Sequence, residues 1–211
     1  MTRRPTGTYR PFRSYDKTIT SMPGEDTRER FIKATGELLR RHGYHGTGLN
    51  DIIRMSGAPR GSLYHYFPGG KDQLVMEALR AAGEHIADMI REILRNRNSI
   101  RAGIGAVFDA LAQEFQASNY SRGCPVAATA LAVAADNEEI RAVCVAVYAS
   151  WTATVQEFLM KAGMAKKPAG ALARLAVQEY EGALLFARIQ RSTTPLREAR
   201  DRVLKATPIR K

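Results

Sequence analysis

The sequence lacks several features that define large protein classes. Only two of its 211 residues are cysteines, Cys124 and Cys144, and they form no Cys-x-x-Cys pair. A disulfide framework and a four-thiolate zinc site are therefore excluded. No apolar run approaches the roughly 18 residues of a transmembrane helix. The first 17 residues are polar and basic, without the apolar segment of a secretory signal. We expect a cytoplasmic protein that does not contact a membrane.

Motifs for catalysis and phosphate binding are missing too. The sequence contains no His-Glu-x-x-His, no Gly-rich phosphate loop and no Gly-x-Ser-x-Gly. Of its four histidines, His42 and His45 flank a turn, and His85 lies in an ordinary amphipathic segment. The sequence therefore predicts neither an enzyme nor a protein with a metal or another cofactor.

Positive charge is abundant and lies at the two ends of the chain. The formal net charge is +11, with +7 in residues 1–71, −2 in residues 72–187 and +6 in residues 188–211. A basic first third predicts a polyanionic partner such as nucleic acid, and the nearly neutral middle indicates a different task. A solvated basic surface accounts for the same charge, so charge alone does not decide.

Apolar spacing divides the chain into three parts. Residues 1–26 mix Arg with Pro and Gly and have no sustained apolar period, which predicts a flexible basic arm. From Thr27 onward nearly every segment has helical spacing, which predicts an all-α fold with domains at residues 27–71 and 72–211. In the second domain we expect helices over residues 71–97, 100–117, 125–135, 138–162 and 169–190. The basic stretch from residue 188 is expected to be solvated surface.

Residues 47–67 have the spacing of a helix-turn-helix. Thr47 is placed to cap a first short helix, a break follows around Gly57, and Pro59 can begin a second helix. Leu63 and Phe67 are four residues apart and are expected to pack inward. The residues left to face outward are Arg60, Ser62, Tyr64 and His65.

These outward residues suit a major groove. Arg60 can donate two hydrogen bonds to a guanine edge, and Tyr64 can reach a phosphate. Lys71 at the start of the next helix adds a positive charge for a phosphate. A lone helix-turn-helix pattern also occurs in plain helical cores, so the residues themselves are needed to decide.

The residues resemble the TetR family of transcriptional repressors. The resemblance lies in Gly-Tyr-His-Gly-Thr (43–47), Asp-Ile-Ile (51–53), Ser-Gly-Ala (56–58) and Gly-Ser-Leu-Tyr-His-Tyr-Phe (61–67), followed by Lys71. Phe-Pro-Gly-Gly-Lys (67–71), Arg-Gly-Cys-Pro-Val-Ala (122–127), Trp151 and Glu-Gly-Ala-Leu-Leu (181–185) are similar to the LmrA/YxaF subgroup. Together these matches cover about residues 27–191.

The resemblance implies a homodimeric repressor of nine or ten helices per chain. Three N-terminal helices would bind palindromic double-stranded operator DNA, and the remaining helical bundle would bind a small apolar or aromatic effector that releases the operator. The DNA-contacting positions carried over are Thr47, Gly48, Asn50, Arg60, Gly61, Ser62, Tyr64, His65 and Lys71. The chain departs from the family at Gly48, where Ser or Thr is common, and at Pro59-Arg60, which replaces a more usual Ser-Lys pair.

Apolar residues of the second domain supply candidates for the pocket and for the dimer. An effector pocket between helices can be lined by Phe108, Leu111, Cys124, Val126, Tyr148, Trp151 and Phe186. The segment 169–190 is apolar on two faces and so needs two partners. We expect one of them to be a second subunit, contacted through Leu172, Leu175, Val177, Leu184 and Leu185.

Two alternatives remain open. Cys124 precedes Pro125 at an expected helix start, where the helix dipole can lower a thiol pKa and create a redox-sensing regulator. A cysteine in such a place is more often a small buried packing residue. A sequence-nonspecific architectural DNA binder would use the same positive charge with little base readout.

Overall fold

The computed structural model describes residues 26–207, and these residues form nine helices and no strand. The helices are α1 (Thr27–His42), α2 (Leu49–Ser56), α3 (Arg60–Tyr66), α4 (Gly70–Leu94), α5 (Ile100–Ala117), α6 (Pro125–Val133), α7 (Glu138–Lys161), α8 (Lys166–Gln190) and α9 (Thr194–Lys205). The all-α prediction is confirmed. The expected basic arm lies, except for Asp26, outside the described residues.

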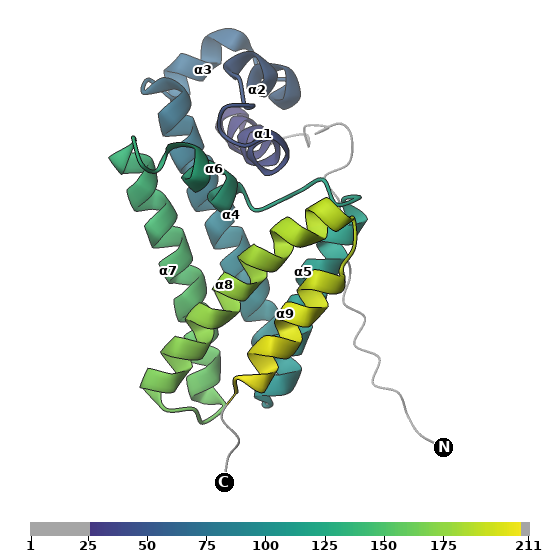
Figure 1. Ribbon diagram of the computed structural model, residues 1–211. Helices are drawn as coiled ribbons and strands as arrows, with labels where there is room; N and C mark the ends of the chain where they lie inside the picture. Colours follow the sequence, from purple (N-terminus) through teal and green to yellow (C-terminus); the bar gives the residue numbers. More distant parts are fainter. Residues whose placement is uncertain (1–25, 208–211) are drawn as a thin grey trace.

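We call α1–α3 the head, which forms one end of the molecule (Figure 1). Its small core joins α1, α2, α3 and the first turns of α4 through Phe31, Ile52, Leu63, Phe67 and Leu74, all buried. The rings of Phe31 and Phe67 meet edge to face with centroids 6.1 Å apart. This packing fixes the orientation of α3, because Leu63 and Phe67 are the inward residues of that segment.

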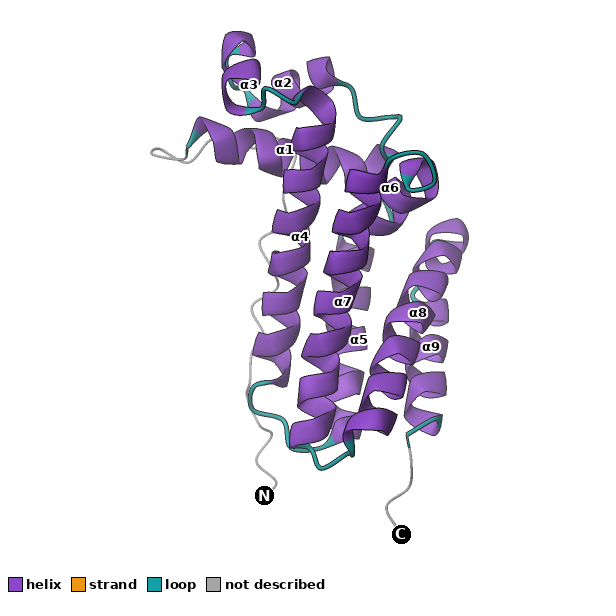
Figure 2. Cartoon of the chain, turned by 90° about the vertical axis from the view of Figure 1, so that its left-hand side faces the viewer, coloured by secondary structure: helices purple, strands orange, loops and turns teal. Residues whose placement is uncertain are grey.

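We call α4–α9 the body. The long helix α4 leaves the head and lies beside α7, which packs in turn against α8 (Figures 1 and 2). Helix α9 packs against α8 and α5, and the short α6 contacts α1, α4 and α7. Asn137 caps α7 by accepting a hydrogen bond of 3.0 Å from the Ile140 amide. Helix α6 therefore sits where the head meets the body.

Two local expectations were wrong. Thr47 does not cap α2, because Gly48 occupies the N-cap position and the Thr47 hydroxyl instead donates to the Gly43 carbonyl at 2.7 Å. The basic C-terminal stretch is not merely solvated surface, because residues 194–205 form α9 and bury Leu196 and Val203 against the body. The sequence analysis missed this short helix because basic residues fill its outer face.

Candidate nucleic-acid interface and ligand cavity

The outer face of α3 is the candidate nucleic-acid interface. Arg60, Gly61, Tyr64 and His65 are exposed, with Tyr64 exposed to 62%. Leu63 on the opposite face is only 1% exposed. A short helix that presents a guanidinium, a phenol and an imidazole while anchored from behind has the size and chemistry to enter a major groove.

The other expected contacts differ in accessibility. Asn50 is exposed near the start of α2, whereas Gly48 and Ser62 are half-buried. Thr47 is fully buried. In this conformation the Thr47 side chain cannot reach DNA, and Asn50 is the exposed polar side chain among the residues carried over onto α2.

Lys71 is half-buried and bonded within its own chain. Its Nζ donates to the Tyr44 carbonyl at 2.8 Å and lies 4.0 Å from the centre of the Tyr44 ring. Burial lowers the pKa of Lys71, although the neighbouring Asp72 opposes the shift. A phosphate contact by Lys71 would therefore compete with the Tyr44 carbonyl for the same ammonium group.

Tyr44 and Asp72 extend this contact to the body. The Tyr44 hydroxyl donates to the Asp72 carboxylate, whose other oxygen accepts from Asn137 Nδ2 at 3.0 Å. Burial and the Asp72 carboxylate raise the pKa of Tyr44 to about 12. Three segments, the α1–α2 loop, the start of α4 and the α6–α7 turn, thus share one polar link. Sequence reasoning missed it because the three residues lie far apart in the chain.

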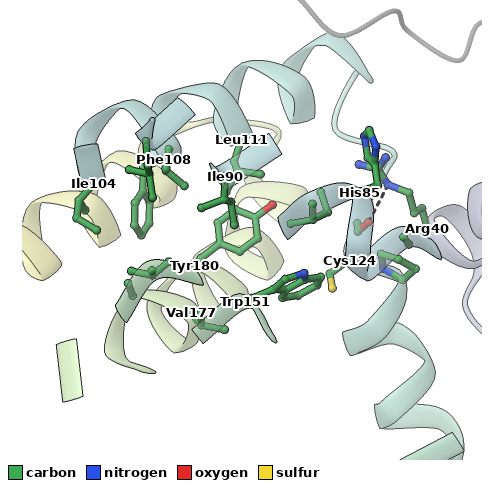
Figure 3. Close-up of a pocket in the computed structure, with 18 residues that line it drawn as sticks. Arg40, His85, Ile90, Ile104, Phe108, Leu111, Cys124, Trp151, Val177 and Tyr180 are labelled. Carbon is green, nitrogen blue, oxygen red and sulfur yellow. Dashed lines mark hydrogen bonds between the residues drawn. The ribbon is translucent and has the colours of Figure 1, made fainter. Parts of the chain in front are cut away.

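An apolar cavity of about 100 Å³ lies in the body. Side chains from α4, α5, α7 and α8 form most of its wall, and the end of α1 and the start of α6 close one side (Figure 3). Trp151 and Tyr180 lie across its middle. The Trp151 indole donates to the Gly83 carbonyl at 2.9 Å, which fixes the ring in place.

The structure separates the residues proposed for the effector pocket. Those that line the cavity are Phe108, Leu111, Cys124 and Trp151. Val126 is fully buried in an adjoining part of the core. Tyr148 borders a surface groove between α7 and α8, and Phe186 is 57% exposed. The last three residues do not line the cavity in this conformation.

Cys124 occupies the N-cap of α6, but its environment opposes thiolate formation. Burial raises the pKa of this thiol well above its ordinary value, and the nearby Glu181 carboxylate raises it further. The expectation that the helix dipole lowers this pKa is therefore wrong, because desolvation outweighs the backbone N–H groups of α6. The described residues contain no group of three His, Cys, Asp or Glu side chains that could hold a metal ion.

Arg40, in the last turn of α1, links the head to the cavity wall. Its Nη2 donates to Glu114 on α5 at 2.7 Å, and its Nε donates to the Gly123 carbonyl at 3.3 Å. The Gly123 amide donates back to the Arg40 carbonyl at 2.9 Å. No sequence motif pointed to Arg40, because an arginine at a helix C-terminus is ordinarily a favourable partner of the helix dipole.

The residues expected at a dimer interface fall into three groups on α8. Leu172 and Leu184 are buried in the core of their own chain. Leu175 and Val177 are half-buried. Leu185 is 59% exposed, beside two more exposed apolar side chains, Phe186 and Ile189. The outer face of α8 is therefore apolar at its C-terminal end.

Helix α7 is also apolar on two sides. Its inner face packs against α4 and α8, while Val145, Ala149, Ala153 and Met160 are exposed on its outer side. It is the one described helix long and apolar enough, by length and composition, to cross a membrane. A core helix of a soluble protein passes the same test, and an apolar outer side equally suits a protein partner.

Two family models match the chain. Residues 31–78 match the bacterial regulatory proteins of the tetR family, and residues 101–202 match the C-terminal domain of LmrA/YxaF-like transcriptional regulators. The uncharacterised HTH-type transcriptional regulator Rv0196 of Mycobacterium tuberculosis is 36% identical over 192 residues, covering 87% of this chain and 97% of the relative. The HTH-type transcriptional regulator LmrA of Bacillus subtilis is 34% identical over 171 residues, covering 81% and 91%.

Solved structures have the same fold. The regulatory protein TetR from Rhodobacter sphaeroides aligns with a TM-score of 0.77 at 22% identity, covering 85% of this chain and 98% of the other. A TetR transcriptional regulator from Legionella pneumophila aligns with a TM-score of 0.77 at 21% identity, covering 87% and 98%. These likenesses extend over head and body together.

Proposed function

Because the chain belongs to the TetR family of HTH-type transcriptional regulators, we propose that it is a ligand-responsive repressor. In this proposal a homodimer in the cytoplasm binds a near-palindromic operator and leaves it when a small apolar molecule enters the body. The chain acts by binding and not by catalysis, in keeping with relatives that are named transcriptional regulators. The observation that carries the proposal is the exposed polar face of α3, anchored by the buried Leu63 and Phe67.

Base reading is assigned to the α3 face. Arg60 and His65 are exposed there and can donate to base edges, while Tyr64 can donate to a phosphate. Asn50 on α2 adds a further exposed polar group toward the DNA backbone. Gly61, which has open space around its Cα, permits close approach of the helix to the DNA.

The outer faces of α7 and α8 are assigned to the dimer. Both helices expose apolar side chains, and Ala149, Ala153 and Val177 line the groove that runs between the two helices. A second copy that covers this surface would bury the two apolar faces at once, and a two-fold interface needs one self-complementary patch. Leu185 belongs to this patch, whereas Leu184 belongs to the core.

A pair of charged substitutions tests this interface. Leu185→Glu places a charge on the exposed patch and should shift the protein from dimer to monomer in sedimentation velocity, with its helical content retained. Leu184→Glu buries a charge in the core and should unfold the chain instead. A Leu185→Glu protein that stays dimeric at the same concentration would show that the interface lies elsewhere.

The cavity is assigned to the effector. Its wall is predominantly apolar, and one side of that wall is formed where α1, α4 and α6 meet. A molecule held there by Phe108, Leu111 and Trp151 contacts helices of the body and, through Arg40, the last turn of α1. Occupancy can therefore bias the position of the head.

Selection of DNA fragments tests the proposal as a whole. Sheared genomic DNA of the source organism is incubated with the purified protein, the retained fragments are sequenced, and the most enriched one is footprinted. We expect a protected near-palindrome of roughly one to two helical turns. Uniform recovery of all fragments would reject the repressor and favour a sequence-nonspecific architectural protein.

A further inference from the structure

The wall of the cavity is electrostatically one-sided. Arg40 and His85 lie at one end, and Ile104 and Phe108 lie at the other (Figure 3). Among the described residues that line the cavity there is no Asp and no Glu. Desolvation lowers the pKa of His85, which favours its neutral form. The guanidinium of Arg40 is therefore the charged group that a ligand in the cavity meets.

Arg40 has hydrogen-bonding capacity left over. A guanidinium carries five N–H donors. In the described part of the chain two donations are made, to Glu114 from Nη2 and to Gly123 from Nε, and the bond to Gly123 is long at 3.3 Å. A partly satisfied guanidinium beside an apolar cavity favours a ligand that brings an acceptor.

The surrounding groups do not reverse this preference. The N-terminus of α6, at Cys124 and Pro125, lies against the same end of the cavity and adds the positive end of a helix dipole. Glu114 pairs with Arg40 and does not line the cavity, and Glu37 is paired with Arg41 and Arg122. Glu181 is not part of the cavity wall, and burial raises the pKa of its carboxyl.

We propose that the effector is an amphipathic anion, with a carboxylate bound by Arg40 and an apolar body held between Trp151 and Phe108. This inference rests on the proposed function of the cavity and adds the charge of its ligand. A cationic ligand would meet the guanidinium without a carboxylate in the cavity wall to balance it. A neutral apolar ligand would leave the spare N–H donors unused.

The position of Arg40 also gives this anion a route to the head. Arg40 lies in the last turn of α1, and its carbonyl accepts from the Gly123 amide at the start of the α6 segment. A carboxylate bound by the spare N–H donors shares the guanidinium with the Gly123 carbonyl and with Glu114, and so weakens those two bonds. Binding therefore alters the contacts that hold α1 against α5 and the residues before α6.

Three probes of similar shape test the inference: 4-ethylbenzoate, 4-ethylbenzamide and 4-ethylbenzylammonium. Trp151 is the only tryptophan of the chain and lines the cavity, so its fluorescence reports occupancy directly. We expect the full-length protein to bind the benzoate at least about tenfold more tightly than the ammonium probe, since a hydrogen-bonded charge pair is worth about one order of magnitude in affinity.

Substitutions then locate the preference. Arg40→Met should reduce benzoate affinity about tenfold and change benzamide affinity by less than about threefold. Arg41→Met is the matched control, because Arg41 is the adjacent arginine of α1 and does not line the cavity. It should leave both affinities unchanged. Arg40→Lys keeps a charge with fewer donors and should fall between the native protein and Arg40→Met.

Several results would overturn the inference. Three results with the native protein would each contradict it: equal affinity for the three probes, preference for the ammonium probe, or no binding of any probe. An unchanged benzoate affinity in Arg40→Met, with the variant folded by circular dichroism, would do so as well. Operator binding of the ligand-free protein is measured in parallel. A protein that binds a specific operator but not the benzoate remains a regulator and loses only this assignment.

Discussion

The head and the body present their functional surfaces in opposite ways. In the head, polar side chains such as Arg60 and Tyr64 face outward from one seven-residue helix, and the apolar side chains behind them form a core of eight buried residues. In the body, Trp151 and Phe108 are 5% and 4% exposed, and the larger of its two clusters buries 21 residues. Because the head has the smaller core, we expect its local stability to be lower than that of the body.

The two regions are joined by an apolar contact and by polar links. Leu39 of α1 is fully buried in an apolar cluster of the body. The polar links are the hydrogen bonds of the Tyr44–Asp72–Asn137 chain and of the Arg40–Gly123 pair. Such contacts can be exchanged for others without repacking a hydrophobic core. In the proposed function, a ligand in the body would bias the head through these polar contacts.

The largest expected effect separates the two regions by stability. Phe67→Ala removes a fully buried ring from the small core and should cost about 3–5 kcal/mol of head stability. Amide hydrogen exchange should accelerate in α2 and α3 and stay slow in α7. Tyr64→Ala is the matched control, because that ring is exposed, and should change stability by less than about 0.5 kcal/mol. Equal loss of protection in head and body would mean that they unfold as one unit.

A smaller effect concerns recognition alone. Arg60→Ala should weaken binding to the selected operator by about 1–3 kcal/mol while changing binding to random DNA much less. Fluorescence anisotropy with both DNAs measures the difference. The control is Arg91→Ala, which removes an exposed arginine from the body. Equal losses on both DNAs would assign Arg60 to the phosphate backbone.

Two glycines of α5 compare tight and loose packing inside the body. A Cβ on Gly103 would lie 2.2 Å from the Phe158 ring, so Gly103→Ala should destabilise the body by about 1–3 kcal/mol. A Cβ on Gly105 meets no atom within 4 Å, so Gly105→Ala should stabilise α5 by about 0.5–1 kcal/mol. Urea unfolding of both variants measures the two signs. Destabilisation by both would indicate that the helix, and not the packing, is sensitive.

The smallest expected effect comes from adding a side-chain cap to α2. Gly48 is the N-cap of α2 without a side-chain hydrogen bond, and a new Cβ there lies 3.2 Å from the flexible Asp51 carboxylate. Gly48→Ser should raise the free energy of unfolding by roughly a few tenths of a kcal/mol. A hydroxyl contact to a phosphate should also tighten operator binding about twofold. The slope of log K against log salt should stay the same, because a hydroxyl displaces no counterion. A steeper slope would point to an altered charge contact.

The head could be predicted from sequence in detail because its information is local. Spacing within about two turns of helix places Leu63 and Phe67 inward. It places Arg60, Tyr64 and His65 outward. The exception was Thr47, whose short side chain can bond to the carbonyl four residues before it as readily as to the helix after it. Such a choice depends on backbone geometry that spacing does not specify.

The body could be predicted only in outline. The spacing of apolar residues located its long helices. The cavity, however, forms from residues of five helices and from the end of α1, which meet only in the folded chain. Tyr148 and Phe186 are aromatic residues on the expected helices, yet they face a groove and the surface. Sequence analysis also missed Arg40. This residue belongs to α1 of the head, but its side chain lines the cavity of the body.

Helix α4 runs from the head into the body as one rod of 25 residues. At 1.5 Å per residue it is about 37 Å long. A tilt of roughly 5° about its body end moves its other end by roughly 3 Å, close to the rise of one base pair along DNA. In a dimer, two such rods set the distance between the α3 helices, which must match about 34–36 Å between half-sites. In the proposed repressor, the length of α4 would thus convert an angular change near the cavity into a loss of register on the operator.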